Sequence, residues 1–300
     1  MNQLSHIARL SGGSGGRKLA GGRVRPTGEL DVARGPHEFR FVKRARRKTT
    51  AEYLLVDISN SFTKMAFATR ERVGKTSRIR TAELTAATLR EFTRGRAVRA
   101  VIVSSVVPKK NAQVKRLTGP ARTLMLGPTL NLGVGVNYPN PKSIGADRLA
   151  NAAAVAELYG SPAVVVDFGT AVTFDVVSAK REYVGGVIAP GLEAMTSFLY
   201  DRTALLPKLT LREPAKAIGR TTRAAMMSGA VHGYRGLVRE ILQQICKERF
   251  GKAKVRIVAT GGYAELIARQ LPEIEAVHQN LTLEGLRIIA NRNLPPPVSA

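Results

Sequence analysis

The sequence is poor in cysteine and has no long apolar run. Its 300 residues include a single cysteine, Cys246, which excludes an intramolecular disulfide framework and any zinc or iron–sulfur site built on several cysteines. This usage favours a reducing compartment, so we expect a cytoplasmic protein. No apolar stretch reaches the roughly 18 residues that a membrane-spanning helix needs. We therefore expect a soluble chain without a membrane partner.

Acidic residues are scarce beside the basic ones. The chain has 22 Asp and Glu against 47 Lys and Arg, which gives a formal net charge of +25. A field of this sign attracts anions such as nucleic acids, acidic lipids or phosphorylated small molecules, and composition does not choose among them. The 44% of apolar residues excludes a wholly disordered chain, and the length suffices for one large domain or two ordinary ones.

Residues 1–50 differ from the rest of the chain. They hold 12 Lys and Arg and 3 Asp and Glu, a net charge of +9, and show no apolar periodicity. We predict a disordered basic leader, because such a segment cannot bury enough apolar surface to offset its ordering entropy. The segment lacks the apolar core of a secretory signal. Three interpretations of the segment stay open: a solvated leader without a role, a transit-like peptide, or a tail that binds nucleic acid or an anionic surface. The lack of interleaved aromatic residues disfavours nucleic-acid binding without excluding it.

Strand and helix patterns mix from residue 53 onward. Apolar runs and alternation predict strands at 53–57, 64–69, 100–107, 163–167, 173–177, 183–188 and 255–259. Helical periodicity predicts helices at 144–159, 222–250 and 283–292. This mixture predicts an α/β protein.

A weak repeat relates two of the strand ends. Val56–Ser61 and Val166–Ala171 share the order apolar residue, Asp, apolar residue, small residue, polar residue and small residue, and they start 110 residues apart. Each is followed by a second strand, so each predicts a hairpin with the acid at its mouth. The repeat predicts two similar domains that face each other across a cleft. The alternative is two unrelated strand ends with ordinary turn chemistry.

An Asp at a strand end beside a turn of small residues suits phosphate chemistry. Exposed N–H groups and hydroxyls bind phosphate oxygens, and the carboxylate holds a cation directly or through water. Two such turns can hold the β- and γ-phosphates of a nucleotide, and Thr260–Gly262 offers a third turn that a base or ribose can approach. Together the turns predict a nucleotide-dependent phosphotransferase.

The sequence also resembles the type III pantothenate kinase family over about residues 53–294. The motifs that carry the resemblance stand in the family's order: Asp57–Lys64, Ser104–Pro108, Tyr138–Pro141, Gly145–Arg148, Asp167–Ala171, Gly185-Gly186, Ala189–Gly191, Ile218-Gly219, Ala259–Gly262 and Leu281–Arg287. The family belongs to the acetate and sugar kinase/Hsc70/actin superfamily. The resemblance implies two facing ribonuclease H-like (actin-like ATPase) domains around a nucleotide cleft. We expect the N-terminal domain, with the first phosphate loop, at 51–160, and the C-terminal domain, with the second loop and the adenosine turn, at 161–300.

The resemblance implies ATP-dependent phosphorylation of pantothenate to 4'-phosphopantothenate, the first step of coenzyme A biosynthesis. It implies Mg²⁺ and a monovalent cation, K⁺ or NH₄⁺, as cofactors and a homodimer with pantothenate bound near the subunit interface. Asp147 matches the catalytic proton acceptor, and Asp167 matches the ligand of the monovalent cation. The residues that match ATP contacts are Asp57, Ile58, Ser59, Asn60, Ser61, Phe62, Thr63, Lys64 and Thr170. Those that match pantothenate contacts are Tyr138, Gly145, Ala146, Asp147, Arg148 and Thr222.

One residue departs from the family pattern. Ser59 stands where the family has glycine, in the turn that approaches phosphate. A positive φ there would cost about 1–2 kcal/mol of strain, whereas a negative φ would let the hydroxyl add a phosphate contact. The alternative function is therefore a catalytically weak or inactive member that acts as a regulatory or nucleic-acid-binding accessory factor. The complete set of Asp57, Asp147 and Asp167 favours the enzyme, and the Gly145–Arg148 segment disfavours another sugar or acid kinase.

Overall fold

The computed structural model describes residues 52–94, 96–118 and 123–296. The basic leader predicted at 1–50 lies outside these residues. The described residues all belong to one compact unit of the chain. None of the helices among them is both long enough and apolar enough to cross a membrane.

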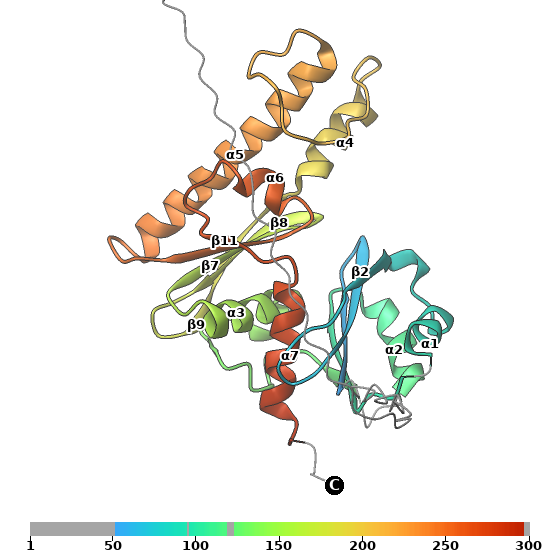
Figure 1. The fold of residues 1–300 in the computed structure, drawn as a ribbon. Helices are drawn as coiled ribbons and strands as arrows, with labels where there is room; N and C mark the ends of the chain where they lie inside the picture. Colours follow the sequence, from blue (N-terminus) through green and yellow to red (C-terminus); the bar gives the residue numbers. More distant parts are fainter. Residues whose placement is uncertain (1–51, 95, 119–122, 297–300) are drawn as a thin grey trace, which may run out of the picture. The chain divides into compact units, whose positions relative to one another are not determined.

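The fold is built on two mixed sheets with the same plan (Figure 1). The first has the order β3-β2-β1-β4-β5, with strands β1 (Tyr53–Ile58), β2 (Phe62–Ala68), β3 (Ser77–Arg80), β4 (Ala100–Ser105) and β5 (Thr123–Met125). The second has the order β11-β10-β7-β8-β9-β6, with strands β6 (Gly135–Val136), β7 (Ala163–Phe168), β8 (Ala171–Val177), β9 (Glu182–Pro190), β10 (Arg256–Gly261) and β11 (Ala276–Val277).

Strands β7 to β11 repeat the arrangement of β1 to β5. In each set the first three strands form an antiparallel meander, and the fourth runs parallel to the first and to the fifth. Asp57 and Asp167 occupy the same place, one residue before the end of the first strand of each set. The weak sequence repeat therefore corresponds to a repeated strand topology.

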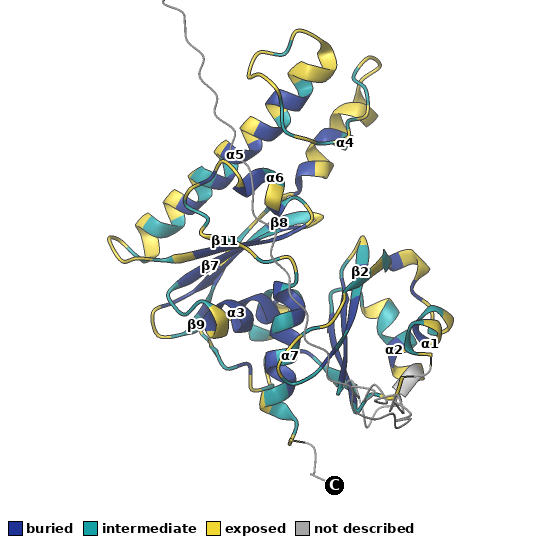
Figure 2. Cartoon of the chain, in the orientation of Figure 1, coloured by how far each residue is buried: buried dark blue, intermediate teal, exposed yellow. Residues whose placement is uncertain are grey.

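Helices cover both faces of each sheet. They are α1 (Ala86–Thr93), α2 (Pro108–Thr118), α3 (Ala146–Leu158), α4 (Leu192–Arg202), α5 (Thr222–Arg249), α6 (Ala264–Ala268) and α7 (Leu281–Asn293), with short 3₁₀ turns η1 (Thr81–Glu83) and η3 (Pro141–Ser143). One apolar cluster joins the first sheet to α1 and α2, a second joins both sheets to α3 and α7, and a third joins the second sheet to α5 and α6. The dark blue stripes of buried residues in Figure 2 follow these layers.

The contact between α3 and α7 lies at the centre of the fold (Figure 1). Helix α3 is rich in buried alanine, which allows the two backbones to approach closely. A Cβ atom at Gly285 of α7 would lie 2.0 Å from the carbonyl oxygen of Ala150, so no other residue fits there. This packing fixes α3, whose first turn holds the candidate catalytic residues.

The predicted α/β class is confirmed. Each strand and helix expected from periodicity is present, with ends within a few residues of those predicted. The sequence did not predict the short edge strands β3, β5, β6 and β11, nor the helices α1, α2, α4 and α6. Pro108 was taken only as the end of a strand, and it is also the first residue of α2, where a missing N–H costs nothing.

Candidate active site

The first candidate phosphate turn follows Asp57 at the end of β1. Asp57 is 4% exposed and lies in register between Lys64 on β2 and Ser104 on β4. Asn60 and Ser61, at the tip of the turn, are exposed. The structure thus presents polar groups at the tip and keeps the carboxylate below it.

Alternation along the strands decides which other loop residues face the site. Ile58 is buried in the apolar cluster under α1 and α2, and Thr63 is buried with its hydroxyl 3.0 Å from that of Thr81. The Phe62 ring is covered by the guanidinium group of Arg78, 3.4 Å from the ring centroid. These three side chains are therefore occupied within the first sheet, and only their backbone is left for a ligand.

Ser59 adopts an unstrained backbone conformation. Among the described residues other than glycine, only Arg181 has a positive φ. The N–H of Ser59 donates to the carbonyl oxygen of Phe62 at 3.2 Å, and its own carbonyl accepts from the Thr81 hydroxyl at 2.7 Å. The strain that a glycine-to-serine change could have caused does not arise here.

The second candidate phosphate turn follows Asp167 at the end of β7, and it meets the first. Gly169 and Thr170 are exposed at its tip. The hydroxyl oxygens of Ser61 and Thr170 lie 2.8 Å apart, 109 residues apart in the chain. The two turns of the sequence repeat are therefore in direct contact.

The first turn of α3 places Asp147 and Arg148. Gly145 is the N-cap of this helix, and Ala146 is buried as its first residue. The Asp147 Oδ1 atom accepts a hydrogen bond from the backbone N–H of Arg148 at 2.9 Å. Burial raises the pKa of Asp147, and the nearby charge of Asp167 raises it further.

Carboxylates crowd this region and raise one another's pKa. Burial, with the charges of Asp147 and Asp167, raises the pKa of Asp57 to about 7. Burial also raises the pKa of Asp167, and the positive charge of Lys64 opposes the increase at both Asp57 and Asp167. The ends of β1 and β7 and the first turn of α3 therefore bring these three carboxylates close enough to influence one another.

A fourth acid, Asp175, lies in the middle of β8 and was not singled out from the sequence. It is fully buried, and its Oδ1 atom pairs with Nε of Arg148 at 2.5 Å. Burial raises the pKa of Asp175 to about 7, although Arg148 opposes the shift. A lone acid in the apolar strand Ala171–Val177 was the available signal, because a buried charge requires a partner.

Asn151 and Thr282 were also missed. Asn151 lies one helical turn after Asp147 on α3, and its Nδ2 atom donates to Oδ2 of Asp167 at 3.2 Å. The hydroxyl of Thr282, on α7, donates to Oδ1 of Asn151 at 2.9 Å. The spacing of four residues between Asp147 and Asn151 on one helix was the signal that would have found this pair.

Of the two outlying residues expected to contact pantothenate, Tyr138 lies near the site and Thr222 is not linked to it among the described residues. The half-buried Tyr138 ring packs against that of Tyr183, with centroids 6.0 Å apart, and the Tyr183 ring lies 5.6 Å from the guanidinium carbon of Arg148. Tyr138 is therefore joined to the Arg148 side of the site. Thr222 is exposed as the first residue of α5, and the described contacts do not link it to the carboxylates.

The carboxylate cluster of Asp57, Asp147 and Asp167 suits a cation that is held partly by the protein and partly by water and a bound phosphate. Within the described residues no three carboxylate, histidine or cysteine side chains are placed to hold a metal together. Asp57 nevertheless has a buried Oδ1 atom without a hydrogen-bond partner among the described residues. Such an oxygen fits a cation whose remaining ligands are water and phosphate oxygens, as is usual for Mg²⁺.

Comparison with known proteins identifies the family. A family model described as type III pantothenate kinase matches residues 53–244, which is more than half of the chain. The chain belongs to this family. Proteins named type III pantothenate kinase from Methylacidiphilum infernorum and Akkermansia muciniphila are 43% and 47% identical to it. The alignments cover 79% and 81% of this chain and 87% and 99% of those proteins.

Solved structures share the fold at low identity. One is of a protein named as a Baf family transcriptional activator from Campylobacter jejuni, with a TM-score of 0.53, 19% identity and coverage of 80% of this chain and 98% of that one. Another is of a protein named as a 2-dehydro-3-deoxygalactonokinase from Sinorhizobium meliloti, with a TM-score of 0.50, 14% identity and coverage of 79% and 98%. At these identities the likeness shows the fold alone. The predicted family and the predicted fold of two ribonuclease H-like units are confirmed, and the boundary at residue 160 stays a prediction.

Proposed function

We propose that this type III pantothenate kinase transfers the γ-phosphoryl group of ATP to pantothenate, giving 4'-phosphopantothenate in the first step of coenzyme A biosynthesis. Family membership supports the substrate pair. The observation that carries the assignment for this chain is the meeting of two repeated turns, joined by Ser61 and Thr170, beside the coupled carboxylates of Asp57, Asp147 and Asp167. A binding module has no need of a carboxylate at that point.

Asp147 is the group that accepts the proton. Its carboxylate takes a hydrogen bond from the pantothenate hydroxyl, orients the oxygen towards the γ-phosphorus, and holds the proton as the new P–O bond forms. A base acts best when its pKa is near the working pH, and the pKa of Asp147 is raised above the ordinary value. Only one of its oxygens is used by the helix, to accept the Arg148 N–H.

The two turns supply the phosphate-binding groups. The exposed hydroxyls of Ser61 and Thr170 are available to contact the phosphate chain, and the positive charge of Lys64 acts on both Asp57 and Asp167. When bound, Mg²⁺ neutralises phosphate charge and favours attack at phosphorus. We assign Mg²⁺ to the side of Asp57, whose buried oxygen lacks a partner among the described residues, and the monovalent cation to Asp167.

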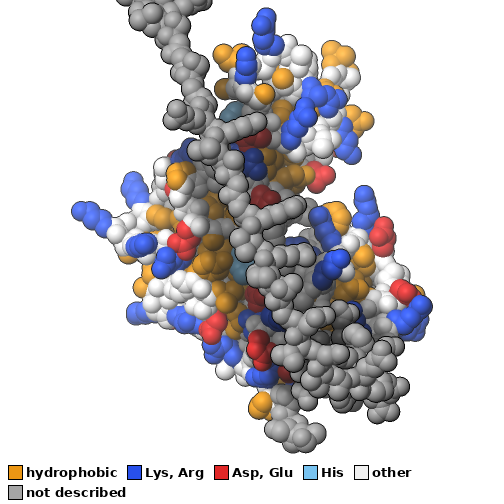
Figure 3. All heavy atoms as spheres, viewed as in Figure 1, with side chains coloured by type: hydrophobic (Ala, Val, Ile, Leu, Met, Phe, Trp, Pro, Cys, Tyr) orange, Lys and Arg blue, Asp and Glu red, His pale blue; other side chains and the backbone are white. Residues whose placement is uncertain are grey.

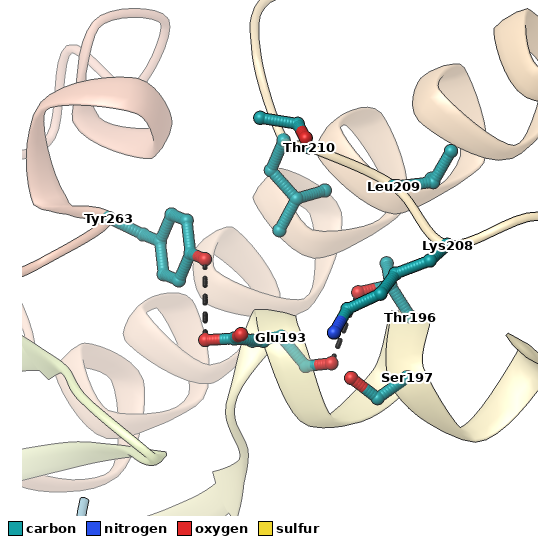
Figure 4. Close-up of a pocket in the computed structure, with 8 residues that line it drawn as sticks. Glu193, Thr196, Ser197, Lys208, Leu209, Thr210 and Tyr263 are labelled. Carbon is teal, nitrogen blue, oxygen red and sulfur yellow. Dashed lines mark hydrogen bonds between the residues drawn. The ribbon is translucent and has the colours of Figure 1, made fainter. Parts of the chain in front are cut away.

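We assign the nucleoside end of ATP to a cavity of about 310 Å³ near the adenosine turn, Thr260–Gly262. It lies next to Tyr263, which directly follows the Thr260–Gly262 turn. Figure 4 shows the Tyr263 ring facing Glu193, whose Oε2 atom accepts from the Tyr263 hydroxyl at 3.5 Å, with Lys208 reaching in from the other side. An aromatic face with charged groups at its edge suits a base and ribose.

Pantothenate binds on the other side of Asp147. Gly145 and Ala146 form the start of α3, where backbone N–H groups favour an anion, and Arg148 contributes the nearest positive side chain on that helix. Tyr138, which packs on Tyr183, forms an apolar wall suited to the methyl groups of the substrate.

We assign a homodimer to this enzyme, with its interface around α4 and the start of α5. Phe198, Leu205 and Ile218 are 61%, 88% and 83% exposed, unusually high for large apolar side chains. Thr222 lies just after Ile218, so a partner covering this surface would also enclose Thr222. Sedimentation of the wild type and of Phe198→Asp tests this, because a monomeric wild type would contradict the assignment. On the face shown in Figure 3, the Lys and Arg side chains of the described residues are spread over the surface.

A coupled assay tests the function directly. The purified full-length chain should convert pantothenate in the presence of ATP, Mg²⁺ and K⁺, and omission of any one component serves as its control. Absence of pantothenate-dependent ADP formation would refute the proposal. A cytoplasmic location stays a prediction.

A further inference from the structure

We propose that Asp175 is a positioning residue, which fixes the guanidinium group of Arg148 so that its terminal nitrogens can bind an acceptor oxygen of the acid substrate. This rests on the proposed function, because it assigns to Arg148 a contact with pantothenate. Neither the sequence motifs nor the family match assigns a role to Asp175.

The pairing of Asp175 with Arg148 is directional. The Oδ1 atom of Asp175 accepts a hydrogen bond from Nε of Arg148, the inner nitrogen of the guanidinium group, at 2.5 Å. The Oδ2 atom of Asp175 accepts from the Thr173 hydroxyl at 3.4 Å. Both side chains are held in the protein, with Asp175 0% and Arg148 13% exposed. Because Nε donates to Asp175, rotation of the Arg148 guanidinium is restricted, and its terminal nitrogens are not used by Asp175.

The terminal nitrogens have no acceptor within the described residues. The Nη2 atom of Arg148 is buried without a hydrogen-bond partner, and Asp175 is the only hydrogen-bond acceptor for this guanidinium among the described side chains and backbone. A buried donor without a partner is unfavourable, and a guanidinium is the residue head best suited to oxygen acceptors. The structure thus contains an oriented donor, adjacent in sequence to the catalytic Asp147, that a substrate oxygen would satisfy.

The residues around the Arg148 guanidinium leave room for it in this orientation. A Cβ atom at Gly186 would lie 1.7 Å from the carbonyl oxygen of Phe174 and 2.8 Å from Nη2 of Arg148, so a side chain there would clash with β8 and also crowd the guanidinium. The Tyr183 ring lies on another side, 5.6 Å from the guanidinium carbon. Arg148 is therefore enclosed by β8 and β9 and anchored by one acid.

Charge adds a reason for precise placement. Asp57, Asp147, Asp167 and Asp175 all act on this region, so an acid substrate approaches a site rich in carboxylates. The positive charge of Lys64 acts on Asp57 and Asp167 at the phosphate turns. Arg148 supplies a positive charge next to Asp147, and it can meet an anionic substrate because Asp175 pairs with its Nε and not with its terminal nitrogens.

The test measures KM and kcat for pantothenate in three variants. Asp175→Asn keeps the size of the side chain but loses the charge that anchors Nε. Arg148→Lys keeps the positive charge but lacks the guanidinium, so it cannot donate to Asp175 and to the substrate from separate nitrogens. The third variant combines both changes. We expect each to raise the KM for pantothenate by about tenfold or more, as loss of a charge-assisted hydrogen bond does, with a much smaller change in kcat and in the KM for ATP. The double variant should be little worse than either single one, because both remove the same contact.

The matched control is Glu157→Gln on the same helix. Glu157 also pairs with arginines, Arg181 and Arg292, but at the surface and away from the site, so its loss should leave KM unchanged. Thermal melting separates placement from folding, since a merely structural Asp175 would lower the melting temperature without the selective KM effect. Additive effects of the two single changes, or an unchanged KM in folded Asp175→Asn, would overturn the inference. An inactive wild type would refute the proposed function instead.

Discussion

Replacement of Asp147 by Asn is the sharpest test of the mechanism. Asn keeps the shape of the side chain and can still accept the N–H of Arg148, which Asp147 Oδ1 accepts at 2.9 Å. It removes the negative charge and the basicity. General-base catalysis contributes about 10²–10⁴-fold, so kcat should fall by about that factor.

The same substitution should leave the fold intact or stabilise it. The charge of Asp147 raises the pKa of Asp57 and of Asp175, so its removal relieves repulsion between buried groups. We propose that the two turns hold ATP, so the KM for ATP should change little. The affinity for pantothenate should fall by at most about 1.5–3 kcal/mol, the value of one charge-assisted hydrogen bond.

The assay is steady-state kinetics with both substrates varied, alongside thermal melting, with Glu157→Gln as the control on the same helix. The expected pattern is a large loss of kcat, a modest change in the KM for pantothenate and an unchanged or higher melting temperature. A variant that keeps more than about a third of the wild-type kcat would show that Asp147 is not the base, and its N-terminal position on α3 would then be its better explanation.

Three further predictions concern the leader, the cation and pH. Residues 51–300 should keep the activity of the full chain, because every matched motif lies in them, and a loss of more than about tenfold would make the leader functional. Replacing K⁺ by Na⁺ at constant ionic strength should lower the rate, whereas equal rates would count against a cation at Asp167. The pKa values of Asp57 and Asp175 are raised to about 7 from 3.8, so the folded state binds more protons between these values. The free energy of unfolding, measured with denaturant, should therefore fall from pH 5 to pH 8 by on the order of a few kcal/mol, and a rise would contradict the assigned shifts.

The sequence predicted the central elements well because their signals are local. Buried strands such as Ala163–Asp167 and the alanine-rich helix α3 carry strong apolar patterns. The edge strands β6 and β11 have two residues each and no pattern of their own, since pairing with a longer neighbour is what makes them strands. Helix α2 was hidden by its mean polarity, because Val114 alone is its buried contact among the side chains described.

Only those site residues that belong to contiguous sequence motifs could be predicted. The repeated Asp turns and the Gly145–Arg148 segment are contiguous, so they were found. Asp175 and Thr282 become site residues only because β8 and α7 pack beside α3, 27 and 131 residues away from their partners in the chain. Which residues of the first loop are free also depends on tertiary packing, since Ile58 and Thr63 are buried while Ser61 reaches Thr170.

The electrostatics of the site give a physical reason to expect that cations assist it. Four carboxylates, those of Asp57, Asp147, Asp167 and Asp175, act on one another against the two positive side chains of Lys64 and Arg148. ATP adds a polyphosphate anion to a region that is already negative when the acids ionise. No three of the described side chains are placed to chelate a metal, so we expect bound cations to balance charge between protein and phosphate. Binding of ATP should therefore depend steeply on cation concentration, and binding of pantothenate, for which we propose Arg148 as the partner, much less.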